Sequence, residues 1–120
     1  MGDRGRKVTQ ADWHGTVRRA AGQAYLNEEL AQTNNHAVNV SVFQGQYPWH
    51  VHPDSDETFA VLEGKLVLDV DGKGEVTLRP GQVYTVPAGV KHRSRGEEDR
   101  TVNLSFGVKN RETIFLEELK

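Results

Sequence analysis

Two histidines and a glutamate lie close together in the sequence and carry the side chains that divalent metal ions bind. His50 and His52 are two positions apart, so on an extended strand both imidazoles point to the same face. Pro53 ends that strand because it has no N–H to donate and fixes its own φ. The polar residues 54–56 indicate a turn, and Glu57 begins the next apolar run. Two imidazoles and a carboxylate brought together in this way are three ligands for a divalent metal.

A segment later in the chain is the candidate source of a fourth ligand. Residues 80–81 predict a turn, and a short strand is expected from Val83 to Val86. A second turn is expected at residues 87–89, and His92 then stands at the head of another strand. The segment therefore offers one further imidazole next to a predicted turn.

At these two segments the sequence resembles the cupin superfamily. The motifs that carry the resemblance are His50-x-His52-x4-Glu57-x6-Gly64 and Gly81-x5-Pro87-x-Gly89-x2-His92. The resemblance spans roughly residues 38–108 and is closest to small single-domain cupins with an RmlC-like jelly roll. These are often described as similar to mannose-6-phosphate isomerase, and most have no assigned reaction.

The resemblance implies both a fold and a metal site. The fold is all-β, a double-stranded β-helix or jelly-roll barrel in one domain, with the metal at the open end of the barrel. The histidine of the second motif completes the site, so the implied ligands are His50, His52, Glu57 and His92. Three of the five histidines fall in this set, whereas His14 and His36 have no partners at meaningful spacing and are expected at the surface.

The strand pattern supports an all-β chain without reference to any family. Val38, Val40 and Val42 alternate with their neighbours, and short strands recur between turns spaced about 8 to 12 residues apart. Asp71-Gly72 predicts a hairpin. No alternation of strands with helices is present, so a parallel sheet is not expected.

We expect the barrel to occupy residues 36–110, between an N-terminal arm and a short tail. Residues 1–35 form the arm, whose first part is polar and basic as in a mobile terminus. Residues 20–31 are ambiguous, because their leucines have helical spacing whereas the resemblance implies an extended edge segment. The tail, residues 111–120, is a strand or a short helix.

Partners are predicted partly from the resemblance and partly from composition. Cupins of this kind commonly pair through sheet edges, which protects those edges, so a homodimer with the arm at its edge is expected. Trp13 is expected to dock on the body or on a second subunit. The net charge of −2 gives no electrostatic footprint for nucleic acid.

Composition also sets the expected location. No apolar run approaches the length of a membrane span, and residues 1–7 lack the apolar core of a signal peptide. There are no cysteines, which excludes disulfides and zinc–thiolate sites. A soluble cytoplasmic protein that binds no membrane is the expectation.

The pocket next to the metal is expected to be mostly apolar and to bind a small-molecule ligand. Its candidate lining residues are Trp49, Phe59, Tyr47, Val42 and Phe106. Since no arginine or lysine is expected to face inward, we predict a small uncharged or weakly anionic ligand and disfavour a phosphorylated sugar.

The ligand set leaves metal and reaction open. Four protein ligands leave two octahedral positions vacant, and the set is compatible with Fe, Mn, Ni, Co, Cu or Zn as one divalent ion. Such a centre suits a metal-dependent enzyme, whether oxygenase, isomerase, cyclase or lyase. The alternative is a non-catalytic module that binds or senses a small molecule through the metal. The enzyme is favoured by a small margin only, because no catalytic residue beyond the ligands is assigned.

Overall fold

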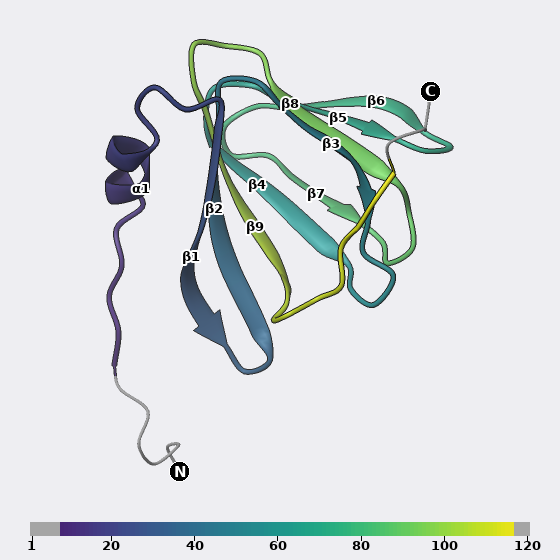
Figure 1. The fold of residues 1–120 in the computed structure, drawn as a ribbon, viewed down its shortest axis with the longest axis horizontal. Helices are drawn as coiled ribbons and strands as arrows, with labels where there is room; N and C mark the ends of the chain where they lie inside the picture. Colours follow the sequence, from purple (N-terminus) through teal and green to yellow (C-terminus); the bar gives the residue numbers. More distant parts are fainter. Residues whose placement is uncertain (1–7, 117–120) are drawn as a thin grey trace.

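The computed structural model describes residues 8–116, in which two five-stranded antiparallel sheets pack face to face (Figure 1). In the order of their pairing, the first sheet contains β1 (Tyr25–Thr33), β2 (His36–Phe43), β9 (Thr101–Val108), β4 (Glu57–Glu63) and β7 (Val83–Val86). The second contains β10 (Ile114–Phe115), β3 (Gln46–Val51), β8 (His92–Gly96), β5 (Leu66–Val70) and β6 (Gly74–Leu78). From β2 to β5 each successive strand crosses to the other sheet, which is the winding of a jelly roll. The predicted all-β, single-domain fold is confirmed.

Turn residues divide the chain where the sequence predicts. The β5–β6 hairpin turns at Asp71-Gly72, where Gly72 has a φ of +83°. That left-handed conformation is one that glycine adopts without steric cost. The strands expected at Val83–Val86 and from His92 onward are β7 and the start of β8.

Apolar side chains form two separate clusters, one on each face of the first sheet. The cluster between the sheets contains Phe43, Phe59, Val61, Leu66, Leu68, Val70, Leu78 and Val86. The second lies on the outer face of the first sheet, beneath the helix α1 (His14–Arg19), and contains Ala20, Val40, Val42 and Val102. Trp13 packs against this outer cluster, so it docks on the body of its own chain. The first sheet is therefore covered on both faces along β2 and β9.

Because the first sheet is covered on both faces, the side chains of β2 and β9 that point into the interior differ from those predicted. The prediction that Val42 and Phe106 line the pocket requires their faces of β2 and β9 to point into the interior. In the structure Val40 and Val42 point outward under α1, while Ser41 and Phe43 point between the sheets. On β9, Val102 likewise belongs to the outer cluster.

The N-terminal region is part of the folded body. β1 pairs with β2 along its whole length, so the boundary drawn between residues 35 and 36 divides a hairpin. The extended alternative for residues 20–31 is confirmed over β1. The helix α1 was not predicted, and it is tied to β1 by an ion pair of 2.6 Å between Arg19 and Glu28.

The outermost residues of both predicted end segments lie outside the described range. These are the basic residues of 1–7 and the end of the tail, 117–120. Within residues 8–116 no helix is long and apolar enough to cross a membrane.

Candidate metal centre

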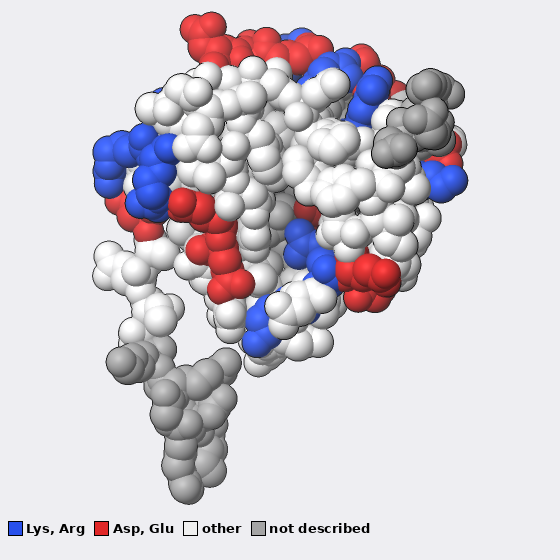
Figure 2. Space-filling model, in the orientation of Figure 1, with Lys and Arg blue, Asp and Glu red and all other residues white. Residues whose placement is uncertain are grey.

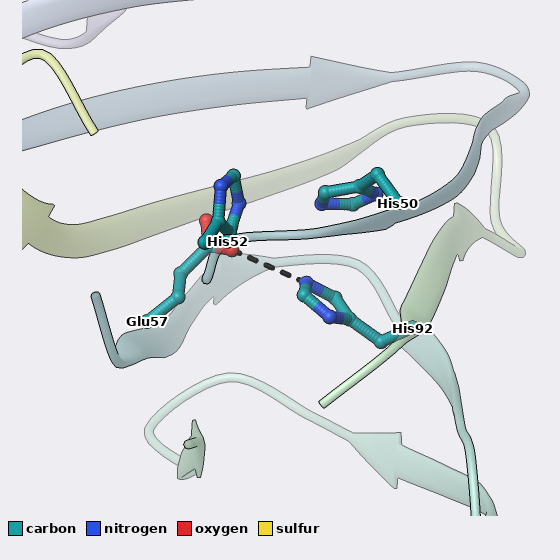
Figure 3. Close-up of side chains that lie close together, drawn as sticks. All are labelled: His50, His52, Glu57 and His92. Carbon is teal, nitrogen blue, oxygen red and sulfur yellow. Dashed lines mark hydrogen bonds and ion pairs between the residues drawn. The ribbon is translucent and has the colours of Figure 1, made fainter. Parts of the chain in front are cut away.

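Four side chains from both sheets converge at one end of the space between the sheets (Figure 3). His50 lies on β3 and His52 directly after it, while Glu57 opens β4 and His92 opens β8. Each residue offers one ligand atom, and these atoms all lie within 4.8 Å of one another. All four residues are buried. The structure thus brings together the complete predicted ligand set.

The backbone fixes how each imidazole is presented. The Nδ1 atoms of His50, His52 and His92 lie 2.8 Å, 3.0 Å and 2.9 Å from the carbonyl oxygens of Pro48, Glu112 and Val90. A carbonyl only accepts, so each Nδ1 carries the proton and donates it. The lone pair of each Nε2 is then free for a metal, as in most metal-binding histidines.

The groups that face one another in the centre require a cation between them. Glu57 Oε1 lies 3.1 Å from His52 Nε2 and 3.3 Å from His92 Nε2. With Nδ1 protonated, nitrogen lone pairs and a carboxylate oxygen would repel each other unless protons or a metal ion bridge them. This donor set fits a divalent transition metal.

The protonation states of His50 and Glu57 are also those that a metal ion requires. Burial, together with the nearby His92, lowers the pKa of His50 to about 4, so this imidazole is neutral at physiological pH. Burial alone would raise the pKa of Glu57, but in the metal-free site protons shared with the Nε2 atoms of His52 and His92, together with the charge of Arg111, outweigh burial and hold that pKa well below its usual value. A neutral imidazole and an ionised carboxylate are the forms that bind metal.

The glycines of the two motifs have specific roles in placing the ligands. Gly64, at the end of β4, has a φ of +84°, and a Cβ built there would lie 2.3 Å from the carbonyl oxygen of Arg100. Any side chain would push β4 away from the start of β9. Gly89, with a φ of +82°, donates its N–H to the carbonyl oxygen of His52 at 2.9 Å and so joins the two motifs.

Two aspartates left out of the predicted ligand set hold the loops around it. Asp54 accepts the N–H of Glu112 at 3.1 Å, which secures the segment whose carbonyl orients His52. Asp56 accepts the N–H of Ala88 at 2.8 Å, in the turn before His92. They act on the backbone, as turn chemistry predicts.

A cavity of about 300 Å³ opens beside the candidate ligands and is lined by His50, His52 and Glu57. Figure 2 shows a hollow in the surface with charged side chains in and beside it. Tyr47 and Phe59 line it, as expected. Most of the remaining lining is polar, and its uncharged polar members include Asn27, Asn39, Ser41, Ser94, Asn103 and Thr113. The prediction of a mostly apolar pocket was therefore wrong.

Three residues expected to line the cavity lie elsewhere. Val42 is in the outer cluster, and Phe106, on the same outward-facing register, is 37% exposed beside a separate groove. Trp49 alternates with His50 on β3, and its ring lies 5.2 Å from the guanidinium carbon of Arg93, outside the cavity lining. Strand parity explains Val42 and Phe106. On β3 the register shift between Tyr47 and His50 lets both of these residues line the cavity, whereas Trp49 does not.

The cavity also contains charged residues that the sequence did not single out. Arg111 lies 3.4 Å from Glu57 Oε2, and Glu29 and Lys109 line the cavity as well. The prediction that no arginine or lysine faces inward was wrong. Arg111 lies after the last long strand with no periodic pattern around it, so only the folded chain shows where it points.

Comparisons with known proteins agree with the fold. Residues 40–106 match the Cupin_2 family model, described as a cupin domain. Uncharacterized protein YdbB of Bacillus subtilis is 42% identical over 96 residues, which cover 80% of this chain and 84% of YdbB. Quercetin 2,3-dioxygenase of the same organism is 40% identical over 63 residues, but these make up 52% of this chain and only 18% of the dioxygenase. A crystal structure of a cupin-2 domain containing protein from Shewanella frigidimarina aligns with a TM-score of 0.66 at 26% identity, covering 78% of this chain and 89% of that one.

Proposed function

The chain belongs to the cupin family, and on that premise we propose that it is a metalloenzyme acting on a small organic molecule. It binds one divalent transition metal ion through His50, His52, Glu57 and His92. The observation that carries the proposal is the convergence of three Nε2 lone pairs and a carboxylate within 4.8 Å, beside a cavity.

The chain's own groups prepare the site for the metal. The three backbone carbonyls hold the imidazoles in one tautomer, and Glu57 is already ionised. A bound ion would supply Lewis-acid chemistry and, if redox-active, electron transfer at the end of the cavity. The cavity walls then orient the small molecule and restrict the access of water.

Oxygenation is the first reaction to test among the four expected types. Its support is the 40% identity to quercetin 2,3-dioxygenase over 63 residues. Isomerase, cyclase and lyase reactions remain within the proposal, because a metal held by these residues would supply the Lewis-acid chemistry that they also use.

Metal content is the decisive measurement. We expect elemental analysis of the purified protein to give about one transition metal ion per chain, and His52→Ala to lose it. His36→Ala is the matched control, since His36 is an exposed histidine outside the site and its loss should leave metal content unchanged. A protein that binds no transition metal, or equal metal content in His52→Ala, would contradict the proposal.

Turnover separates the enzyme from a binding or sensing module. The metal-loaded protein would be assayed for oxygen consumption and for product formation over a panel of small organic molecules. Metal-dependent turnover lost in His52→Ala supports the enzyme. Thermal stabilisation by a molecule that is never converted identifies the binding module instead.

A further inference from the structure

Arg111 is held in the cavity without enough hydrogen-bond partners. Its Nη2 lies 3.4 Å from Glu57 Oε2 and its Nη1 lies 3.5 Å from the Val108 carbonyl oxygen, both at the long limit for a hydrogen bond. Within residues 8–116 its buried Nε–H has no acceptor. A guanidinium has five N–H donors, and an arginine this far buried normally satisfies them. The side chain therefore has unused capacity for an acceptor on a ligand.

A second polar group in the same cavity lacks a partner of the opposite kind. Asn103, on β9, is 1% exposed, and among the described residues its Oδ1 is buried without a donor. It lies opposite Ser41 in the β2–β9 register. Ser41 receives the amide of Asn27 at 2.6 Å, and Asn27 in turn receives the amide of Asn39 at 2.7 Å. These polar side chains form one row on the inner face of the first sheet.

Arg111 and Asn103 lack opposite kinds of hydrogen-bond partner, so a ligand that pairs with both must carry an acceptor and a donor. Arg111 requires an acceptor, and Asn103 Oδ1 requires a donor, so an aliphatic or purely anionic molecule would satisfy only one of them at most. Both residues line the cavity, so an occupant would lie next to the side chains that lack these partners.

Charge in the cavity selects an anion once a metal is present. Its charged lining consists of two acids, Glu29 and Glu57, and two bases, Lys109 and Arg111. These balance, so a divalent metal ion leaves the cavity with a net positive charge of two. A ligand with negative charge is then favoured electrostatically over a neutral one.

We propose that the small molecule bound by this centre is a hydroxycarboxylate. Its carboxylate pairs with Arg111, and its hydroxyl groups donate to Asn103 and exchange hydrogen bonds with the row of Asn27, Asn39 and Ser41. This substrate class rests on the proposed function, because the anion preference assumes the metal. Arg111 and Asn103 are the specificity-determining residues.

A carboxylate fits better than a phosphate. Of the two bases in the lining, Lys109 donates to Gln32 at 3.3 Å. The guanidinium of Arg111 lies beside Glu57, and its planar donors match the two oxygens of a carboxylate. A phosphate group presents three strong acceptor oxygens, which one guanidinium edge would leave partly unpaired. The volume of about 300 Å³ is also at the small end of ligand cavities.

Calorimetric titration of the protein loaded with Co²⁺ tests the proposal. The panel contains the hydroxycarboxylates glycolate, lactate, malate and gluconate. It also contains sorbitol as a neutral polyol, propionate as a carboxylate without hydroxyls, and inorganic phosphate. We expect at least one hydroxycarboxylate to bind at least tenfold more tightly than sorbitol, propionate and phosphate. Its binding should also change the visible absorption of the cobalt ion.

Two variants at the site and one control assign the contacts. Arg111→Gln and Asn103→Asp should each weaken hydroxycarboxylate binding at least tenfold. Asn103→Asp keeps the size of the side chain but adds a negative charge, which repels the carboxylate. Arg93→Gln is the matched control, because Arg93 is ion-paired to Asp69 at 2.7 Å and lies outside the cavity lining. Its affinity should equal that of the unsubstituted protein.

The outcomes separate this inference from the function on which it rests. The cobalt content of every variant is measured first. If cobalt binds but no hydroxycarboxylate does, if phosphate or sorbitol binds better, or if Arg111→Gln retains full affinity, the substrate class is overturned while the metal site stands. If cobalt itself does not bind to the unsubstituted protein, the proposed function fails first.

Discussion

At the scale of single residues, the orientation of each histidine ring determines which nitrogen faces the metal site. Each of the three histidines presents Nε2 to the centre because a backbone carbonyl accepts its Nδ1 proton. A substitution of a neighbouring side chain leaves these carbonyls in place, although His52 Nδ1 also lies 3.1 Å from the hydroxyl oxygen of Thr113. The orientation of each ring is therefore set by the path of the backbone, with or without a metal.

The depressed pKa of His50 predicts a pH dependence in the metal-free protein. Burial lowers that pKa from 6.5 to about 4, so below pH 6.5 the unfolded chain takes up a proton that the folded one does not. The free energy of unfolding should therefore fall as the pH drops, by about 2 kcal/mol between pH 7 and pH 4.5. Glu57 adds little in this window, because its stabilisation is lost only as the pH falls through and below its ordinary value of 4.5.

Urea unfolding in the presence of a chelator measures this loss. His50→Gln, which cannot take up the proton, should show a pH dependence smaller by the same amount. A variant that keeps the whole dependence would show that the burial of His50 is not its source.

At the scale of elements, the short C-terminal segment after β9 works as part of the site. Glu112 supplies the carbonyl that orients His52, and Arg111 supplies the cation beside Glu57. β10 pairs with β3 at Val51 and His50, which keeps this segment against the metal ligands. A segment expected to be a simple tail thus closes one side of the centre.

Ending the chain after Arg111 should weaken metal binding about 10- to 100-fold, the usual effect of losing a partner that orients a ligand. The reason is that His52 Nδ1–H loses both the Glu112 carbonyl and the Thr113 hydroxyl. Competition with a chelator gives the affinity for Zn²⁺.

The control for this truncation is Glu112→Ala in the full chain. It removes the side chain but keeps the carbonyl, so its affinity should be unchanged. A truncated chain that binds Zn²⁺ as tightly as the full one would show that the segment is dispensable.

At the scale of the molecule, the ligands come from both sheets. Glu57 belongs to the first sheet, while His50 and His92 belong to the second. A bound metal would therefore cross-link the two sheets. It would do so at the end of the barrel that contains the cavity, where fewer apolar side chains hold the sheets together. The homodimer expected from the resemblance stays a prediction, to be checked by light scattering.

Metal should accordingly stabilise the whole domain. At a free concentration of 100 times the dissociation constant, the free energy of unfolding should rise by about 2.7 kcal/mol. Thermal unfolding with and without a chelator measures the change. His52→Ala should show almost none of it, and an equal shift in that variant would place the bound metal elsewhere.

The sequence by itself determined the fold class and the candidate ligands. Period-two alternation and turn residues predict short strands, and the spacing of His50, His52 and Glu57 follows from one strand, one turn and the next strand. These features are local, because neighbouring residues alone fix them. The distant His92 came from the motif resemblance.

Only the tertiary structure decided which face of each strand points into the cavity. The alternation of β2 fits either face, and the outward choice depends on α1, which covers Val40 and Val42. Because Val40 and Val42 face outward, Ser41 and Asn103 lie on the inner face of the first sheet and line the cavity. The segment that follows β9 places Arg111 beside Glu57. Such placements depend on contacts between residues far apart in the chain, and no local pattern records them.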